Sequence, residues 1–169
     1  TCQECHMPAV NRKLIQNEPW QKLHARKEGK AHTFSVSSAM KKKKDFIDLK
    51  FTEINHDKKQ IAGNVEIINT KVNHSIPTGK YGYKEILLLI NLKDSLGTII
   101  KSKQESMFVE LNTQLNPGEK RIVNFIFDLK GKNSGEKGLE ASLFRTNFDR
   151  ADRTEFASVK MELDQSMKD

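Results

Sequence analysis

The sequence predicts a mainly β fold: an antiparallel, immunoglobulin-like β-sandwich preceded by a short, partly helical amino-terminal segment. From Asp45 onward, apolar and polar residues alternate, which is the pattern of strands that bury one face. Turn residues separate these stretches at near-regular intervals. No helical period lies between them, which argues against a parallel sheet with crossover helices.

The first part of the chain, residues 1–44, differs in composition from everything after it. It holds both cysteines, three of the five histidines, the only tryptophan and a run of lysines at residues 41–44. A proline and a glycine stand at suitable ends, so a short helix is expected over residues 20–30. Adjacent like charges resist burial, so we expect a solvated hinge that divides this segment from a sandwich domain of residues 45–169.

Seven or eight stretches of the second part are expected to be strands. Those that begin at Ile47 and Ile61, and the last one, alternate with period two and should each bury one face. Residues 86–90 and 122–127 are apolar on both faces and should lie in central strands. The expected strands are residues 47–52, 61–67, 85–92, 99–103, 107–111, 121–129, 139–144 and 157–163. The expected turns are residues 56–57, 77–79, 94–97, 116–118 and 133–135.

Composition limits the class of protein. The 169 residues carry 29 Lys and Arg against 22 Asp and Glu, a formal charge of +7, and 36% of them are hydrophobic. That supply of apolar side chains is sufficient for one core and argues against global disorder. The longest apolar run, residues 86–90, is far shorter than the roughly 20 residues of a membrane-spanning helix. Thr1 is not a natural translation start, so the chain is expected to be a processed or excised product.

The strongest chemical signal is the pentapeptide CQECH, which contains Cys2, Cys5 and His6. It fits C-x-x-C-H, the attachment signature of c-type haem. Two thiols three positions apart can each reach a vinyl group on the same porphyrin edge, while the next residue places its imidazole under the iron. Cys2 and Cys5 are therefore expected to anchor haem c covalently, with His6 as an axial iron ligand.

Two other interpretations of the cysteine pair remain open. A C-x-x-C pair is half of a structural zinc site, but zinc requires four ligands, and His24 and His32 lack the usual spacing of three to five residues. A thioredoxin-like redox pair requires an α/β context, which the sequence does not show. Covalent haem attachment is therefore the preferred interpretation.

Three motifs resemble those of multihaem c-type cytochromes. TCQECHMP, residues 1–8, is similar to the last haem-binding motif of many members, and AHTF, residues 31–34, is similar to the His-x-Phe element that follows it. NTKVNHSIPTG, residues 69–79, resembles a loop that ends in His-x-x-Pro-Thr-Gly within the family's carboxy-terminal β-sandwich. The resemblance spans nearly the full chain, is specific at these motifs and is loose between them.

The chain also departs from the family in two respects. Members often continue the His-x-Phe element with Pro-Gly-Gly, where this chain has SVS at residues 35–37. Members usually carry several C-x-x-C-H motifs, and this chain carries one. The resemblance therefore implies that further haems lie either in a region outside this chain or in other subunits.

A second axial ligand would make the iron six-coordinate, which suits electron transfer. Met7 adjoins His6 and cannot reach the opposite face of the porphyrin. His56 is expected to be solvated in a polar turn. The preferred candidates are His32, in the element that resembles His-x-Phe, and His74, in the Pro-Thr-Gly loop. The remaining candidates are His24, on the surface of the expected helix, and Met40.

These observations favour an extracytoplasmic electron-transfer protein, a c-type cytochrome subunit or fragment with bis-histidine haem ligation, over an enzyme. One alternative is a subunit of a multihaem oxidoreductase acting on nitrogen or sulfur oxyanions. Another is a β-sandwich that serves as an interaction or adhesion module. No nucleophile elbow or phosphate-binding loop points to another enzyme class.

The expected partners are redox proteins or other haem-bearing chains, and an oligomer is compatible with the sequence. The charge of +7 would attract an acidic redox partner. Nucleic-acid binding is not expected, because the lysine run at residues 41–44 lacks interleaved aromatic residues. Covalent haem attachment implies a periplasmic or extracellular location, because the maturation machinery acts outside the cytoplasm in bacteria.

Overall fold

The computed structural model describes two compact units, Thr1–Lys43 (the amino-terminal unit) and Lys44–Asp169 (the sandwich unit), and each is treated by itself. The described residues are Met7, 9–12, 27–30, 46–78, 84–109, 111–129, 136–146 and 153–163. Within the described residues there is no membrane-spanning helix.

The amino-terminal unit contains a pair of short antiparallel strands, β1 (Ala9–Arg12) and β2 (Lys27–Lys30). The expectation of a helix over residues 20–30 is wrong at its end, because β2 occupies those positions, and residues 20–26 lie outside the described residues. Helix propensity is a weak local preference, and Gly29, a poor helix former, is paired here with the distant Val10. The side chain of Met7 is buried.

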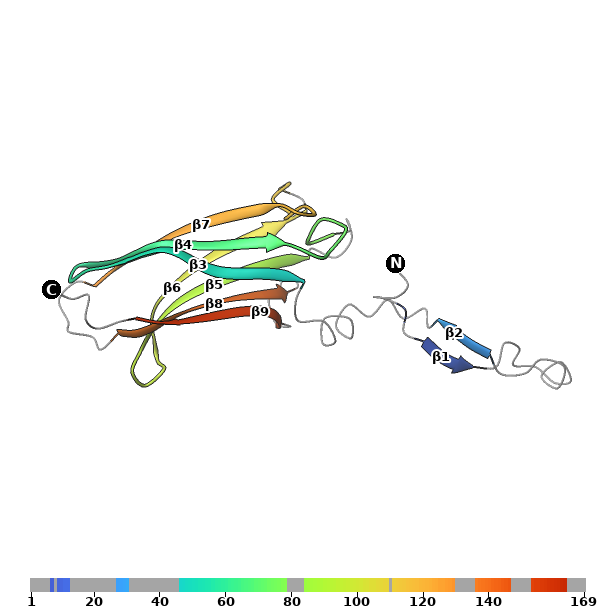
Figure 1. The fold of residues 1–169 in the computed structure, drawn as a ribbon, viewed down its shortest axis with the longest axis horizontal. Coiled ribbons are helices and arrows are strands. Elements are labelled where there is room, and N and C mark those ends of the chain that lie inside the picture. Colours follow the sequence, from blue (N-terminus) through green and yellow to red (C-terminus); the bar gives the residue numbers. More distant parts are fainter. Residues whose placement is uncertain are drawn as a thin grey trace, which may run out of the picture. The chain divides into compact units, whose positions relative to one another are not determined.

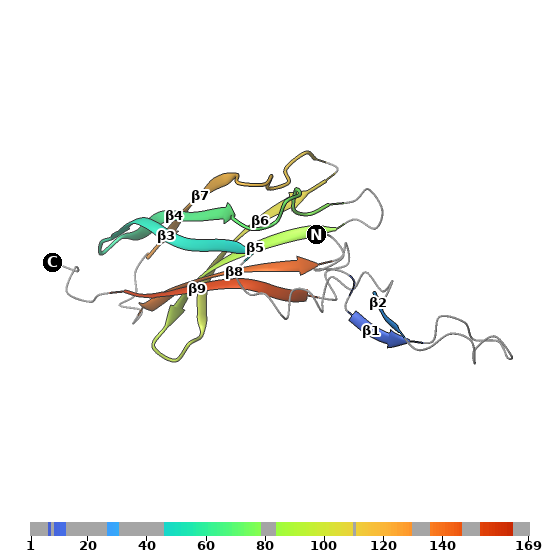
Figure 2. The ribbon, with the colours of Figure 1, turned by 45° about the vertical axis from the view of Figure 1, so that its right-hand side comes forward.

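The sandwich unit contains seven described strands in two antiparallel sheets (Figure 1). The three-stranded sheet has the order β3–β4–β7 and the four-stranded sheet the order β6–β5–β8–β9. Figure 2 shows the same two layers from a second direction. The mainly β, antiparallel sandwich predicted from the sequence is therefore confirmed. The strands are β3 (Ile47–His56), β4 (Gln60–Asn69), β5 (Glu85–Asp94), β6 (Ile99–Phe108), β7 (Lys120–Asp128), β8 (Glu136–Thr146) and β9 (Arg153–Glu162).

One expected strand position and one expected strand boundary are wrong. Residues 122–127, expected in a central strand, belong to β7 at the edge of the described three-stranded sheet, where Ile122 and Ile126 are exposed. Residues 99–103 and 107–111 are predicted as two strands, but β6 runs without a break through the polar residues 104–106. β6 is an edge strand that pairs only with β5, so its polar side chains reach solvent without interrupting the strand. The turn expected at residues 94–97 is confirmed, with Gly97 at φ 81° and its N–H bonded to the Asp94 carbonyl at 3.0 Å.

The core lies between the inner faces of the two sheets. On β4, the side chains of Ile61, Val65 and Ile67 are completely buried. The ring of Phe125 on β7 packs edge-on against Phe51, with 6.1 Å between ring centroids. Burial of such apolar surface is the main force that holds the two sheets together. The four-stranded sheet contributes Ile86, Leu88, Ile90, Leu92, Leu139, Ala141 and Leu143.

Beside a bulge in β3, the core is closely packed around Gly63. The pairing of β3 with β4 shifts register between Thr52 and Asn55, and Glu53 adopts a positive φ of 54°. A Cβ atom at Gly63 would lie 2.3 Å from Ile54 Cδ1 and 3.3 Å from Phe125 Cζ. The space beside Gly63 is therefore filled by the side chain of Ile54.

Replacing Gly63 by Val should lower the free energy of unfolding by about 1–3 kcal/mol, because it overpacks the contact with Ile54 and Phe125. Ala62→Val is the matched control, since Ala62 is its neighbour in β4 and points to the other face of the sheet. Urea unfolding followed by far-ultraviolet circular dichroism, which reports the strands, would measure both. Equal losses in the two variants would contradict the tight packing of the inner face.

Candidate functional site

The expected site residues fall into two groups. Cys2, Cys5, His6 and His32 lie outside the described residues, and so do the secondary candidates at positions 24 and 40. His74 lies within the described residues, on the loop that joins β4 to β5. The geometry of the candidate site is therefore that of the loop carrying His74.

Asn69 anchors this loop to the end of the sandwich. Alternation along β4 continues the inner face to Asn69, which is 1% exposed. Its Nδ2 donates to the carbonyl oxygens of His74, at 3.2 Å, and Leu115, at 3.3 Å, and its Oδ1 accepts from Val72 N at 3.2 Å. A buried amide must find partners, and here those partners are the two loops at this end.

A short β-bridge ties the same loop to the connection between β6 and β7. Ile76 N donates to the Leu115 carbonyl at 2.9 Å, and Leu115 N donates to the Ile76 carbonyl at 2.8 Å. Both side chains are buried, and the peptide bond between Ile76 and Pro77 is cis. The loop that carries His74 is thus paired with a neighbouring loop.

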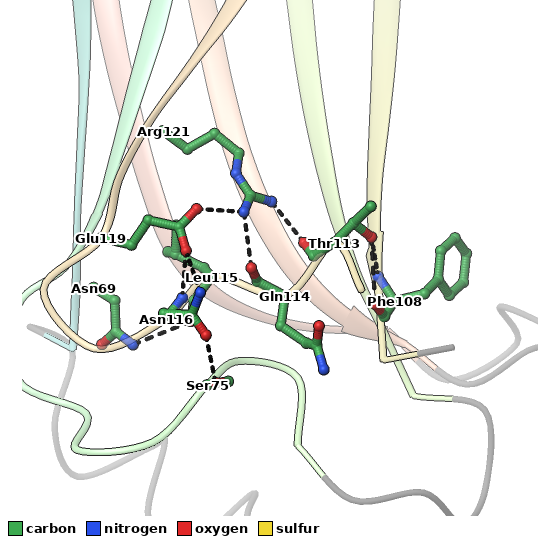
Figure 3. A network of polar contacts seen from close by, with 9 residues as sticks. All are labelled: Asn69, Ser75, Phe108, Thr113, Gln114, Leu115, Asn116, Glu119 and Arg121. Atoms are coloured by element: carbon green, nitrogen blue, oxygen red, sulfur yellow. Dashed lines mark hydrogen bonds and ion pairs between the residues drawn. The ribbon is translucent and has the colours of Figure 1, made fainter. Parts of the chain in front are cut away.

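A network of polar contacts extends from this bridge to β7 (Figure 3). Ser75 Oγ donates to Asn116 Oδ1 at 2.8 Å, and Asn116 donates to Glu119 Oε2 through its backbone N at 2.8 Å and its Nδ2 at 2.9 Å. Arg121 forms an ion pair with Glu119 and donates to the carbonyls of Thr113, at 2.6 Å, and Gln114, at 2.8 Å. Charged hydrogen bonds of this kind are stronger than neutral ones.

The pKa of Glu119 lies below its ordinary value. Partial burial raises this pKa, but hydrogen bonds from the Asn116 backbone and from Arg121, together with the charge of Arg121, outweigh the burial. Glu119 is therefore ionised at neutral pH, which is the state in which it accepts both hydrogen bonds from Asn116.

His74 itself is exposed, and its Nδ1 has a defined partner. Its Nδ1 lies 2.9 Å from the Ser75 carbonyl oxygen. A carbonyl can only accept, so Nδ1 carries the hydrogen and the lone pair of the neutral ring is on Nε2. An Nδ1–H bond to a backbone carbonyl is a common arrangement for histidines that ligate a metal through Nε2. An exposed imidazole in this tautomer has the chemistry of a metal ligand.

His56 differs from its expected environment. The sequence predicts a solvated turn histidine, but His56 is the last residue of β3 and pairs with Ile61, so the turn begins at Asp57. Asp57 Oδ1 closes that turn by accepting from Lys59 N at 2.7 Å and Gln60 N at 2.9 Å. Both ring nitrogens of His56 are buried, without a hydrogen-bond partner among the described residues.

His56 and His74 belong to opposite ends of the sandwich. His56 lies near the first residue of β4, whereas His74 follows its last residue, and ten residues of strand span about 30 Å. The two histidines therefore cannot ligate one iron. Among the described residues, no three His, Cys, Asp or Glu side chains form a group that could hold a metal ion.

Sequence reasoning missed the polar network. The turn at residues 116–118 is correctly predicted from its Asn, Pro and Gly, and Glu119 N closes it by donating to the Asn116 carbonyl at 3.0 Å. No local pattern, however, indicates that the Asn116 side chain binds Ser75 on another loop.

Replacing Glu119 by Gln should destabilise the sandwich unit by roughly 1–2 kcal/mol at pH 7, the range for a partly exposed charged hydrogen bond. The pKa of Glu119 is lower in the folded state than in the unfolded state, where it is about 4.3, so its ionisation stabilises the folded protein above that pH. This stabilisation is lost as the pH falls through the pKa of the folded state. The difference between wild type and variant should therefore shrink from pH 7 to pH 3. Urea unfolding at each pH would measure it, and a constant difference would contradict the lowered pKa.

Comparisons with known proteins concern the fold. No family model matches the sequence, and no curated protein matches it. The structure is similar to that of a penta-haem cytochrome c552 from Thermochromatium tepidum, with a TM-score of 0.62, 18% identity and coverage of 96% of this chain and 47% of that chain. The chain therefore spans about half the length of that cytochrome.

Two glycoside hydrolases are more distant. A β-glucosidase from Kluyveromyces marxianus has a TM-score of 0.33 and 16% identity over 70% of this chain and 14% of that chain. A β-glucuronidase from Bacteroides uniformis has a TM-score of 0.35 and 13% identity over 70% of this chain and 13% of that chain. Both TM-scores are too low to indicate a shared fold. The fold of this chain is therefore similar to that of part of a multihaem cytochrome.

Proposed function

We propose that this chain is a haem-bearing part of a multihaem c-type cytochrome that transfers electrons in the periplasm or outside the cell. The observation that carries the proposal is the C-x-x-C-H signature of residues 2–6 in a chain whose fold is similar to that of a penta-haem cytochrome. Either feature alone is weaker support for a haem protein, because the pentapeptide is short and a sandwich fold serves many functions.

Each site residue has a distinct role in this proposal. Cys2 and Cys5 anchor the porphyrin through thioether bonds, and His6 ligates the iron on one face. His74 is the proposed ligand on the other face, supported by its exposure and by the lone pair on Nε2. His32 is the alternative for that position. The bound haem supplies one-electron chemistry, and the chain supplies anchoring, ligation and surroundings.

The distribution of charge supports a redox partner that binds near the haem. Residues 1–43 contain nine Lys and Arg against three Asp and Glu, whereas residues 44–169 contain twenty against nineteen. The amino-terminal unit therefore carries +6 of the net +7, before any haem propionates are counted. A field of this sign attracts acidic partners and raises encounter rates at low salt.

Protein matured in a host with the haem-attachment machinery should have the mass of the polypeptide plus about one haem. A Cys2→Ser/Cys5→Ser double variant should lack both the added mass and the haem absorption bands, because the thioether bonds cannot form. Intact-protein mass spectrometry and absorption spectroscopy would measure these outcomes. A bare polypeptide from a host that matures other c-type cytochromes would contradict the proposal, and a high-spin spectrum shifted by nitrite would favour the oxidoreductase alternative.

Replacing His74 by Ala in the haem-loaded chain should convert the ferric iron from low to high spin, and added imidazole should restore the low-spin spectrum. His56→Ala is the matched control, because that histidine lies at the far end of β4 and should leave the spectrum unchanged. Absorption and electron paramagnetic resonance spectra would distinguish the two. An unchanged spectrum in His74→Ala would exclude His74 as the second ligand and leave His32 as the preferred candidate, with His24 and Met40 remaining.

A further inference from the structure

The loop that carries His74 is held by side chains to which the proposed function gives no role. We propose that Asn116, Glu119 and Arg121 form a positioning relay that holds Ser75 through its hydroxyl, directs the Ser75 carbonyl and so sets the tautomer and direction of the His74 imidazole. This inference rests on the proposed role of His74 as an axial ligand. The three residues act through Ser75 and are therefore positioning residues.

The relay begins at one peptide group. The Ser75 carbonyl accepts the Nδ1–H of His74 at 2.9 Å, and the N–H of the same peptide group, that of Ile76, donates to the Leu115 carbonyl at 2.9 Å. Its plane is therefore fixed by a partner on another loop. A peptide group that donates on one side is a better acceptor on the other, because hydrogen bonds in a chain polarise one another.

Asn116 adds a second point of attachment on the same residue. Its Nδ2 donates to Glu119 Oε2 at 2.9 Å, so its Oδ1 must face the Ser75 hydroxyl, which donates to it at 2.8 Å. The orientation of the Asn116 amide is thus determined by the carboxylate of Glu119. Figure 3 shows this path from Ser75 through Asn116 to Glu119.

Arg121 connects the relay to the sheet. It lies on β7, and its guanidinium binds Glu119 and the carbonyls of Thr113 and Gln114 in the loop before that strand. The guanidinium is planar and always charged, so it holds all three acceptors in one geometry. Glu119 is therefore fixed relative to β7, and the position of Ser75 follows from that of β7.

Asn69 fixes the other peptide group of the loop. Its Nδ2 donates to the His74 carbonyl at 3.2 Å, which belongs to the peptide group between His74 and Ser75. The next peptide group, between Ser75 and Ile76, is held through Ile76 N, so the backbone on the carboxyl side of His74 is held at two successive peptide groups. The imidazole then has a defined direction as well as a defined tautomer.

For a metal ligand, such support has a known effect. A carbonyl partner at Nδ1 keeps the lone pair at Nε2 and increases the basicity of the ring as a ligand. Loss of a supporting partner of this kind typically weakens metal binding about 10–100-fold. The relay should therefore determine how readily another ligand displaces His74 from the iron.

The first test uses the full chain produced without haem. Nitrogen-15 and carbon-13 NMR at about pH 9, where imidazoles are neutral, should give His74 the signature of a single Nδ1–H tautomer. Asn116→Ala should lose that signature, and so should Ser75→Ala, which removes only the hydroxyl group. Ser75→Thr, which keeps the hydroxyl, should retain it. Asn124→Ala, at an exposed position on β7, is the matched control. An unchanged tautomer in both Ala variants would overturn the relay.

The second test uses the haem-loaded chain. The affinity of the ferric iron for cyanide should rise about 10–100-fold in Asn116→Ala, because cyanide displaces His74 more readily, and should be unchanged in Asn124→Ala. Equal affinities in the two variants would overturn the relay. A haem spectrum unchanged by His74→Ala would instead contradict the proposed ligation, and the NMR experiment would still decide whether the relay sets the tautomer.

Discussion

Burial of the inner face of β4 is the constraint on which both the core and the candidate site depend. The same alternation that buries Ile61, Val65 and Ile67 continues to Asn69 at the end of the strand. An apolar residue there would merely extend the core. A buried amide, in contrast, must be hydrogen-bonded, and its partners are the two loops that close this end of the sandwich. Packing of the sheets and positioning of the loops are therefore linked through one strand.

This end of the sandwich is also where the chain enters it. The Phe46 carbonyl, just before β3, accepts from Thr70 Oγ1 at 3.2 Å, next to the loop that carries His74. The segment that precedes Phe46 therefore joins the sandwich unit beside this loop.

The strands were predictable because their signal is local. Period-two alternation in residues 47–51 reflects the pleat of a single strand, whatever its partner. The errors arose where pairing overrides local pattern. β6 stays continuous through polar residues because it is paired with β5, and residues 27–30 form a strand because they pair with β1. His56 is partly buried because β3 extends further than its alternation indicated.

The sequence by itself determined the C-x-x-C-H spacing of residues 2–6, the β class of the fold, and the surplus of positive charge in residues 1–43. Each of these is a property of consecutive residues or of composition. Only the tertiary structure decided that Ser75 is held by Asn116, that Glu119 orients this amide, and that the His74 ring carries its hydrogen on Nδ1. The contact between Ser75 and Asn116 joins residues 41 positions apart, and all three hydrogen bonds depend on distance and angle in space, which the order of residues does not encode.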